Sequence, residues 1–314
     1  MILLFCYNAL VIHRLMTQRN HILHPGESIL TGDLSCLNWM YEPDSFISLK
    51  LDGSPALCYG RNPANGKFCI GTKSVFNKVK IKIAHSHEEI DQFYEGKVAE
   101  ILHKCFDYLP RTQKFYQGDF IGEGGSDTYR PNTITYRFPE VVEQSIIICP
   151  HTEYKCKNDL RDAVAYPLTR KFEDTHDVKW IQPEVEICPY REDIEDFCKF
   201  AKQMSTLCTF VNEKQAKELR KVLNSYVREG KEVDEHEIAE NYDVDINLMR
   251  LYKLVESIKM DLFYYIECDP EFTCEIDGKL SDNEGYVMTN QYGTYKIINR
   301  DEFSRLNLTL PKQW

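Results

Sequence analysis

The sequence predicts an α+β fold, in which an antiparallel sheet is interrupted by a block of helices before its last strands. Two observations predict it. Short runs rich in β-branched and aromatic residues dominate the first half of the chain, and the hydrophobic period becomes helical between residues 191 and 265. Strand-like runs then return near the end. With 314 residues, of which 43% are hydrophobic and 28% charged, the chain is long enough to bury a sizeable core.

The strand predictions rest on short apolar runs separated by Gly and Asn. Arg61–Gly66 predicts a hairpin loop and Gly122–Gly125 a further turn. One helix is expected over roughly His87 to Leu109. The predicted strands are Phe46–Leu51, Ala56–Tyr59, Phe68–Thr72, Phe115–Ile121, Ile134–Phe138 and Ser145–Cys149, followed after the helices by Gly285–Thr289 and Gly293–Asn299.

The helical block begins near residue 191 and ends near residue 265. Its apolar residues recur at helical spacing, and the stripe Leu248–Leu262 is expected to pack in the core. Gly230 predicts the end of one helix, and Asp245 or Asn247 is expected to cap the last one. We therefore expect residues 16–190 and 266–314 to form one domain, with residues 191–265 as a helical insertion or lid.

The net charge of −11 argues against a protein that coats nucleic acid by charge alone, because phosphate contacts require clustered Lys and Arg. Acidic residues concentrate between Glu184 and Asp245. A polarised surface with a local basic cleft is therefore predicted. The basic residues that lie close together in sequence are Lys67, Lys73, Lys78, Lys80 and Lys82.

The twelve cysteines are scattered without a CxxC pair, which predicts free thiols in a reducing cytosol rather than a zinc site or a disulfide scaffold. His21 and His24 lie three apart but lack a third ligand, so a surface or capping role is expected. Residues 1–15 are apolar but too short for a membrane span, and they are expected to be a non-native extension before a start at Met16. The expectation is a cytoplasmic monomer that does not bind membranes.

The segment Lys50-Leu51-Asp52-Gly53 lies where a predicted strand meets a turn. A lysine in this position can project its amine into a cleft, and Gly53 allows the backbone to approach a phosphate. By itself the tetrapeptide is better explained as a solvated lysine beside a turn. Its interpretation therefore depends on the later segments of the chain.

Three further segments occur in order: Tyr116-Gln117-Gly118-Asp119-Phe120, Asn283-Glu284-Gly285-Tyr286-Val287 and Tyr295-Lys296-Ile297-Ile298-Asn299. With the KxDG segment, they make the chain resemble the covalent nucleotidyltransferase superfamily of ATP-dependent DNA ligases, RNA ligases and mRNA-capping enzymes. That superfamily carries KxDG, a strand of the form hydrophobic-x-Gly-Glu, a Glu-Gly strand and a final lysine-bearing strand. Lys73 is similar to the basic residue that the RNA-ligase branch places on the strand after its nucleophile.

The resemblance covers residues 46 to about 303, apart from the helical block, and the chain also resembles an uncharacterised group of proteins from phages and large DNA viruses. It departs from the DNA-ligase pattern at Pro55, where an arginine is usual, and at Ile298, where a second lysine is common. The chain ends 18 residues after Lys296, so no OB-fold domain is expected. The helical block is expected to supply closure over the nucleotide in its place.

The resemblance implies an antiparallel-sheet nucleotidyltransferase (ligase adenylation) domain that uses ATP and Mg²⁺. Lys50 would form a covalent lysyl-AMP, and the AMP would pass to the 5′-phosphate of a nucleic acid, either RNA or a nicked duplex, whose backbone would lie near Lys78, Lys80 and Lys82. The implied cofactor-binding residues are Lys50, Gly53, Lys73, Asp119, Glu284 and Lys296, and the implied catalytic residues are Lys50, Asp52, Lys73 and Lys296.

Two of the implied roles carry alternatives. Asp119 and Glu284 are expected to hold the metal, although Asp119 could instead hold the ribose hydroxyls; Asp52 would orient Lys50 or bind the metal. A lysine amine must lose its proton before it attacks phosphorus, and Lys73 and Lys296 are expected to lower the pKa of Lys50 by like-charge repulsion.

Two rival hypotheses remain from sequence. The first is a catalytically inactive ligase homologue that binds nucleotide or nucleic acid without forming the covalent bond. The second is an unrelated viral structural or interaction protein with chance motif matches. Covalent labelling of Lys50 separates the first from a ligase, and convergence of the four motifs on one pocket separates the second.

Overall fold

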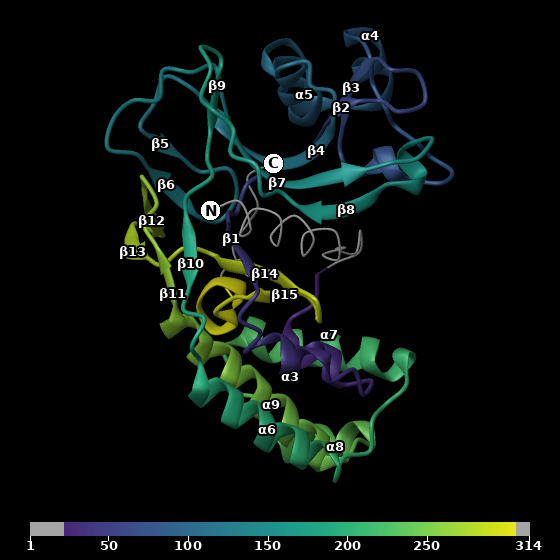
Figure 1. The fold of residues 1–314 in the computed structure, drawn as a ribbon, viewed down its shortest axis with the longest axis vertical. Helices are drawn as coiled ribbons and strands as arrows, with labels where there is room; N and C mark the ends of the chain where they lie inside the picture. The colour runs from purple at the N-terminus through teal and green to yellow at the C-terminus, as the bar shows by residue number, and fades with distance from the viewer. Residues whose placement is uncertain (1–21, 306–314) are drawn as a thin grey trace, which may run out of the picture.

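The computed structural model describes residues 22–305, so the predicted extension at residues 1–15 and His21 lie outside the described part. The molecule is elongated (Figure 1): a six-stranded sheet with two helices on its outer face lies at one end, a three-stranded sheet in the middle and a bundle of helices at the other end. This is a mixed α+β architecture whose sheets are almost wholly antiparallel, as the sequence predicts.

The six-stranded sheet has the order β3-β2-β4-β7-β8, with β9 paired to β7 in parallel. Its side chains alternate between two faces, as strand geometry requires. Leu57, Tyr59 and Ile148 pack with helix α5 on the outer face, whereas Gln117 and Asp119 face inward. The strands are β2 (Ala56–Arg61), β3 (Phe68–Gly71), β4 (Phe115–Glu123), β7 (Ile146–Lys155), β8 (Val164–Pro167) and β9 (Val178–Trp180).

The expected helix from His87 to Leu109 is two helices, α4 (His87–Phe93) and α5 (Gly96–Tyr108). Tyr94 and Glu95 between them have extended backbones, and Glu95 is the N-cap residue of α5. Apolar periodicity spans the break because both helices pack on the same face of the sheet, so periodicity could not reveal it.

The three-stranded sheet is β1-β14-β15, formed by β1 (Phe46–Lys50), β14 (Gly285–Asn290) and β15 (Gly293–Ile297). Although β1 and β14 are far apart in sequence, they pair directly in antiparallel register. Period-two alternation again separates two faces. Ile47, Met288 and Ile297 pack toward the helices, and the opposite face looks toward the six-stranded sheet.

The helices beneath this sheet are α6 (Glu192–Ser205), α7 (Glu213–Glu229), α8 (Glu235–Tyr242) and α9 (Ile246–Asp261), with η3 (Leu262–Tyr265) continuing α9. Gly230 ends α7 in the left-handed conformation, and Asp245, rather than Asn247, is the N-cap residue of α9. The helices α2 (Pro25–Ile29), preceded by His24 as its N-cap residue, and α3 (Ser35–Trp39) pack against them.

The helical block does not form a separate hydrophobic unit. Its buried residues, such as Leu251 and Val255, belong to one core cluster with Trp39, Met288 and Ile297. The division into a sheet domain and an insertion therefore describes the order of the chain, whereas the packing joins both parts through a common core.

Several short strands, all but one of them outside the sequence predictions, form two further small sheets. A four-stranded sheet is formed by β13 (Lys279–Ser281), β12 (Thr273–Ile276), β6 (Thr135–Arg137) and β5 (Thr128–Tyr129), and β10 (Val185–Ile187) pairs with β11 (Ile266–Cys268). The predicted strand Ile134–Phe138 corresponds to β6. The remaining elements are η1 (Lys73–Phe76), η2 (Leu160–Asp162) and η4 (Arg300–Ser304).

The cysteines within residues 22–305 are free thiols, as the scattered spacing predicts. In the same part of the chain, none of the helices combines the length and the apolar character needed to cross a bilayer.

Candidate active site

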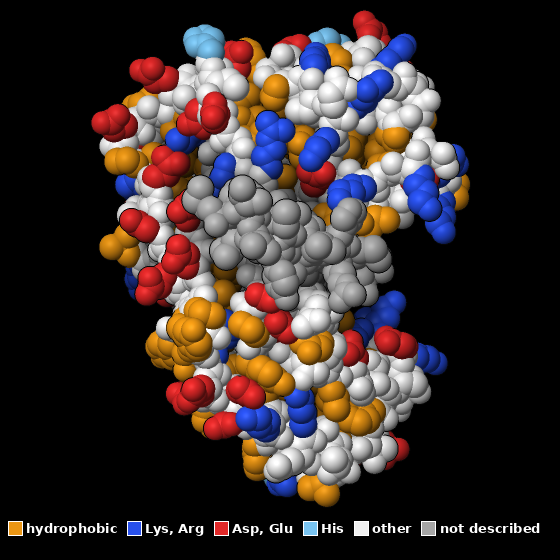
Figure 2. Space-filling view, in the orientation of Figure 1, with side chains coloured by type: hydrophobic (Ala, Val, Ile, Leu, Met, Phe, Trp, Pro, Cys, Tyr) orange, Lys and Arg blue, Asp and Glu red, His pale blue; other side chains and the backbone are white. Residues whose placement is uncertain are grey.

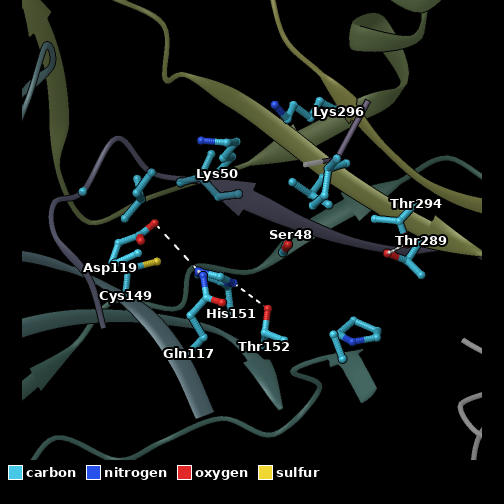
Figure 3. Close-up of a pocket in the computed structure, with 18 of the residues that line it drawn as sticks. Ser48, Lys50, Gln117, Asp119, Cys149, His151, Thr152, Thr289, Thr294 and Lys296 are labelled. Carbon is cyan, nitrogen blue, oxygen red and sulfur yellow. Dashed lines mark hydrogen bonds and ion pairs between the residues drawn. The ribbon is translucent and has the colours of Figure 1, made fainter. Parts of the chain in front are cut away.

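A cavity of about 380 Å³ lies between the inner faces of the three-stranded and six-stranded sheets (Figure 3). Lys50 and Lys296 come from the three-stranded sheet, and Gln117, Asp119 and His151 come from the opposite wall. Six of the seven residues predicted from the sequence line this cavity: Lys50, Asp52, Gly53, Lys73, Asp119 and Lys296. The seventh, Glu284, contacts Lys50 directly. Such convergence disfavours chance motif matches.

Strand register explains why the two lysines face the same cavity. Lys50 pairs with Gly285 across β1 and β14, and Lys296 pairs with Val287 across β14 and β15. Positions 285 and 287 are two residues apart on β14, so both lysines lie on the same face of the sheet. The backbone N–H of Lys296 also donates to the Leu23 carbonyl at 3.1 Å, which fixes the outer edge of β15.

Lys50 forms an ion pair with Glu284, in which Nζ lies 2.5 Å from Oε1. The Lys50 side chain is 29% exposed and that of Glu284 only 5%. Burial by itself would lower the pKa of Lys50, but the negative charges of Glu284, Asp119 and Asp52 outweigh it and raise that pKa above its ordinary value. The prediction that nearby lysines lower the pKa of Lys50 is therefore wrong, because the charges that act most strongly on this amine are carboxylates.

Gly285 follows Glu284 for a steric reason. Its φ of 133° is rarely adopted by residues with a side chain, and a Cβ there would lie 2.2 Å from the Ile297 carbonyl oxygen on β15. Only glycine permits β14 to pair with β15 at this position. In the Glu-Gly dipeptide, Glu284 supplies the charge that contacts Lys50, and Gly285 allows the close pairing of β14 with β15 that places Glu284 beside it.

The Asp52 carboxylate binds a neighbouring loop. Its Oδ1 accepts a hydrogen bond from the Asn132 side chain at 2.7 Å, and its Oδ2 accepts from the backbone N–H groups of Thr133 at 2.6 Å and Ile134 at 3.1 Å. Asp52 is buried and also contributes negative charge near Lys50. These hydrogen bonds tie the turn that follows Lys50 to residues 132–134, so the main role of Asp52 in this structure is to hold that turn.

Gly53 lies against β4 rather than against open space. A Cβ at Gly53 would be 2.6 Å from the Asp119 Cβ and 3.0 Å from the Phe120 carbonyl oxygen. The missing side chain therefore allows the turn to pack beside Asp119. A close approach to phosphate, which the sequence suggested, is not what requires glycine here.

Asp119 lies on β4 with its side chain 18% exposed to the cavity. Its Oδ2 is 3.8 Å from His151 Nε2, and His151 Nδ1 is 2.7 Å from the Thr152 hydroxyl. Lys73 is the first residue of η1 and not part of a strand, because β3 ends at Gly71. It lies at the rim of the cavity with an exposed side chain.

The pKa of Lys296 is lowered from 10.5 to about 8. Burial is the largest cause, and the positive charge of Lys50 adds to it, while Glu27 and Glu284 oppose the shift. Of the two lysines, Lys296 therefore has the amine that loses its proton more easily. The sequence analysis expected this lowered pKa at Lys50 instead.

The fit of a divalent cation can be examined at the two predicted carboxylates. Between residues 22 and 305, no three His, Cys, Asp or Glu side chains form a group that could hold a metal ion by themselves. However, Mg²⁺ is usually held by one or two carboxylates together with substrate phosphates and water. The second oxygen of Glu284 is buried without a hydrogen-bond partner among the described residues. Asp119 and Glu284 therefore fit a nucleotide-bound Mg²⁺.

Comparison with models of protein families finds a match over most of the chain. The family described as "Family of unknown function (DUF6267)" matches residues 20–244 and 234–312 of the chain. The chain belongs to this family. No curated protein and no solved structure matches the chain. The DUF6267 match includes every residue of the candidate site from Lys50 to Lys296.

The helical block of this DUF6267 chain does not cover the cavity. No residue from 191 to 265 is among the described residues that line it. The helices pack on the other face of the three-stranded sheet, where they support β1, β14 and β15 from behind. The apolar stripes of the helices are buried in this shared core, and closure over a nucleotide by the helical block stays a prediction.

Sequence analysis missed several polar residues of the cavity wall. They share the inward face of a strand with a predicted residue, so period-two alternation could have found them: Ser48 follows from Lys50, Gln117 from Asp119, and Thr294 from Lys296. His151 on β7 also lies in the cavity wall.

Proposed function

We propose that this protein is a ligase-like covalent nucleotidyltransferase with the ligase adenylation fold. It would react with ATP to form lysyl-AMP at Lys50 and pass the AMP to the 5′-phosphate of a nucleic acid strand for sealing. One observation carries the proposal: Lys50, Asp119 and Lys296, which lie on distant parts of the chain, line a single cavity in which Glu284 contacts Lys50. The resemblance of the four motifs supplies the reaction class.

In the proposed reaction, the neutral Lys50 amine attacks the α-phosphorus of ATP. An N–P bond forms, the bond from the α-phosphorus to the bridging oxygen breaks, and pyrophosphate leaves. An oxygen of the acceptor 5′-phosphate then attacks the same phosphorus and releases Lys50. Finally, the 3′-hydroxyl of the second strand attacks the activated 5′-phosphate, and AMP leaves.

The residues around Lys50 have roles in this scheme. Glu284 is the nearest proton acceptor, because its Oε1 already contacts the Lys50 ammonium. Lys73 and Lys296 supply positive charge to the phosphates from two sides of the cavity. Mg²⁺ bound at Asp119 and Glu284 would neutralise charge on the departing pyrophosphate.

The Lys50–Glu284 ion pair also favours a second candidate function, a nucleotide-binding homologue that forms no covalent bond. The carboxylates around Lys50 raise its pKa and so favour its charged form, which is not nucleophilic. Turnover requires the bound nucleotide to change that state. A protein in which this change fails would bind ATP without reacting.

The deciding experiment is incubation with α-³²P-ATP, or separately α-³²P-GTP, and Mg²⁺, followed by denaturing electrophoresis. We expect a labelled band that is absent from Lys50→Ala and retained in Lys199→Ala, which removes an exposed lysine far from the cavity. A label that survives Lys50→Ala would refute the assignment of the nucleophile. Bound but unreacted nucleotide, measured by equilibrium dialysis, would favour the second candidate.

A further inference from the structure

Two loops that are distant in sequence meet at the rim of the cavity. One is η1 with the residues after it, 73–82, and the other is the connection from β7 to β8, residues 155–162, which contains η2. Val75 and Leu160 are buried in the same small core cluster, so the two loops are fixed against each other. Lys73 lines the cavity, as do Tyr154 and Ala165 at the two ends of the second loop.

Both loops carry exposed positive charge. Residues 73–82 contain four lysines and no acidic residue. The second loop adds Lys155, Lys157 and Arg161, offset in part by Asp159 and Asp162. In Figure 2, lysine and arginine side chains are present on the side where β7 and β8 reach their right-hand ends, while many acidic side chains lie along the left edge.

Not every basic residue here is available to a partner. Lys82 Nζ donates to the Phe93 carbonyl at 2.7 Å and lies over the Tyr94 ring, so it holds the loop against α4. Arg161 pairs with Asp159 at 2.6 Å. Lys82 is therefore not among the lysines that can bind a phosphate backbone, although the sequence analysis included it. Lys155 Nζ lies over the Tyr166 ring, 4.4 Å from its centroid, and is occupied in the same way. The residues that remain, here called the basic rim, are Lys73, Lys78, Lys80 and Lys157, all exposed and without an ion pair to any described residue.

The side chains of the basic rim favour binding to phosphate groups over binding to bases. Flexible lysines act as point charges that contact phosphates, whereas base edges are read by planar groups such as arginine and amides. Between Lys78 and Lys80 the side chain at the surface is Val79, 91% exposed, and residues 77–82 contain no aromatic ring on which a base could stack. The rim therefore suits a polyphosphate backbone.

We propose that the basic rim binds the phosphate backbone of the acceptor nucleic acid without reading its sequence, and so guides a 5′-phosphate end toward Lys50. The inference rests on the proposed function for the identity of the acceptor, and it adds where that strand enters. On a chain with a net charge of −11, most of the surface repels a polyanion, so a local cluster of four lysines determines the entry side.

The test measures binding without chemistry. The Lys50→Ala protein, which cannot form the covalent intermediate, is titrated into a fluorescently labelled, 5′-phosphorylated oligonucleotide across a series of salt concentrations. Separate arms use single-stranded RNA, single-stranded DNA and a nicked duplex. Each lysine that contacts a phosphate should contribute about −0.7 to −0.9 to the slope of log affinity against log salt.

Lys78→Glu/Lys80→Glu should weaken binding at least about tenfold and make the salt slope shallower by about 2 units. The matched control is Lys214→Glu/Lys217→Glu on α7, which alters the same number of charges at exposed positions away from the cavity. If both double variants weaken binding equally, the proposal that the basic rim binds the nucleic acid is refuted. An absence of binding in every arm would refute it too.

The outcomes separate this inference from the proposed function. If Lys78→Glu/Lys80→Glu alone loses binding and Lys50 is not labelled by ATP, the basic rim binds nucleic acid but the proposed ligase chemistry is rejected. If Lys50 is labelled and Lys78→Glu/Lys80→Glu binds nucleic acid as well as before, the proposed chemistry stands and binding by the basic rim is rejected.

Discussion

At the scale of single residues, the two lysines of the cavity differ in the charges that surround them. Although burial opposes the shift, the pKa of Lys50 is raised by the carboxylates of Asp119 on β4, Glu284 immediately before β14 and Asp52 in its own turn. The pKa of Lys296 is lowered mainly by burial and by the charge of Lys50. Two lysines on the outer strands of one three-stranded sheet thus have pKa shifts of opposite sign. The proposed chemistry must remove the proton of Lys50.

Lys296 should react with an amine-directed reagent at lower pH than exposed lysines do. A lysine with a pKa of 10.5 is roughly 0.03% neutral at pH 7, and one with a pKa of about 8 is roughly 10% neutral. Only the neutral amine is nucleophilic. Labelling of the Lys296 peptide, followed by mass spectrometry, should therefore rise with a midpoint near pH 8. Labelling that parallels the Lys78 peptide over the whole pH range would contradict this.

The same shift has a consequence for stability. The pKa of Lys296 is lower in the folded protein than its ordinary value of 10.5, so the unfolded chain binds more protons between pH 8 and 10.5. The contribution of Lys296 to the free energy of unfolding is therefore unfavourable below pH 8 and becomes less so as the pH rises. Lys296→Met should be more stable than the wild type at pH 7, with a difference that shrinks by pH 10.

At the scale of elements, the three-stranded sheet is the part that assembles the site. Its period-two alternation presents Ser48, Lys50 and Lys296 on one face while the other face packs on the helices. The register depends on Gly285, where β14 passes too close to β15 for any side chain. A local glycine thereby determines a long-range pairing.

Gly285→Ala should destabilise the protein by roughly 3 kcal/mol or more, because it combines an unfavourable φ with a backbone clash. Urea denaturation measures the change. The control is Gly125→Ala, where φ is also positive at 95° but a Cβ would meet no atom within 4 Å. That change should cost only about 1–2 kcal/mol. Equal losses at both positions would mean that backbone strain, not the contact with Ile297, accounts for the effect.

At the scale of the whole molecule, the helices and the sheets share a core. The cluster that contains Leu251 of α9 also contains Met288 of β14 and Ile147 of β7. Unfolding the helical block would therefore expose the back of β14, the strand that follows Glu284. The block supports the candidate site by packing.

Leu251→Ala should lower the stability of the whole chain and not of the helices alone. Leu251 is fully buried, and its truncation should cost about 2–5 kcal/mol. Hydrogen exchange measured by mass spectrometry should speed up in peptides from β14 as well as in those from α9. If only α9 responded, the helices would be an independent unit. Leu207→Ala, at a position 70% exposed, is the control and should change neither.

The amino-acid sequence predicts the local features of this protein: strands at Phe46–Leu51 and Phe68–Thr72, each of which ends one residue earlier in the structure, the helix end at Gly230 and the four segments that hold the candidate site. These result from residue periodicity and backbone preference, which act within a few residues. Tertiary structure alone decided the break before Gly96, the ion pair of Lys50 with Glu284 and the position of the helices behind the sheet. Each of these depends on burial and charge contributed by distant parts of the chain, which no local pattern records.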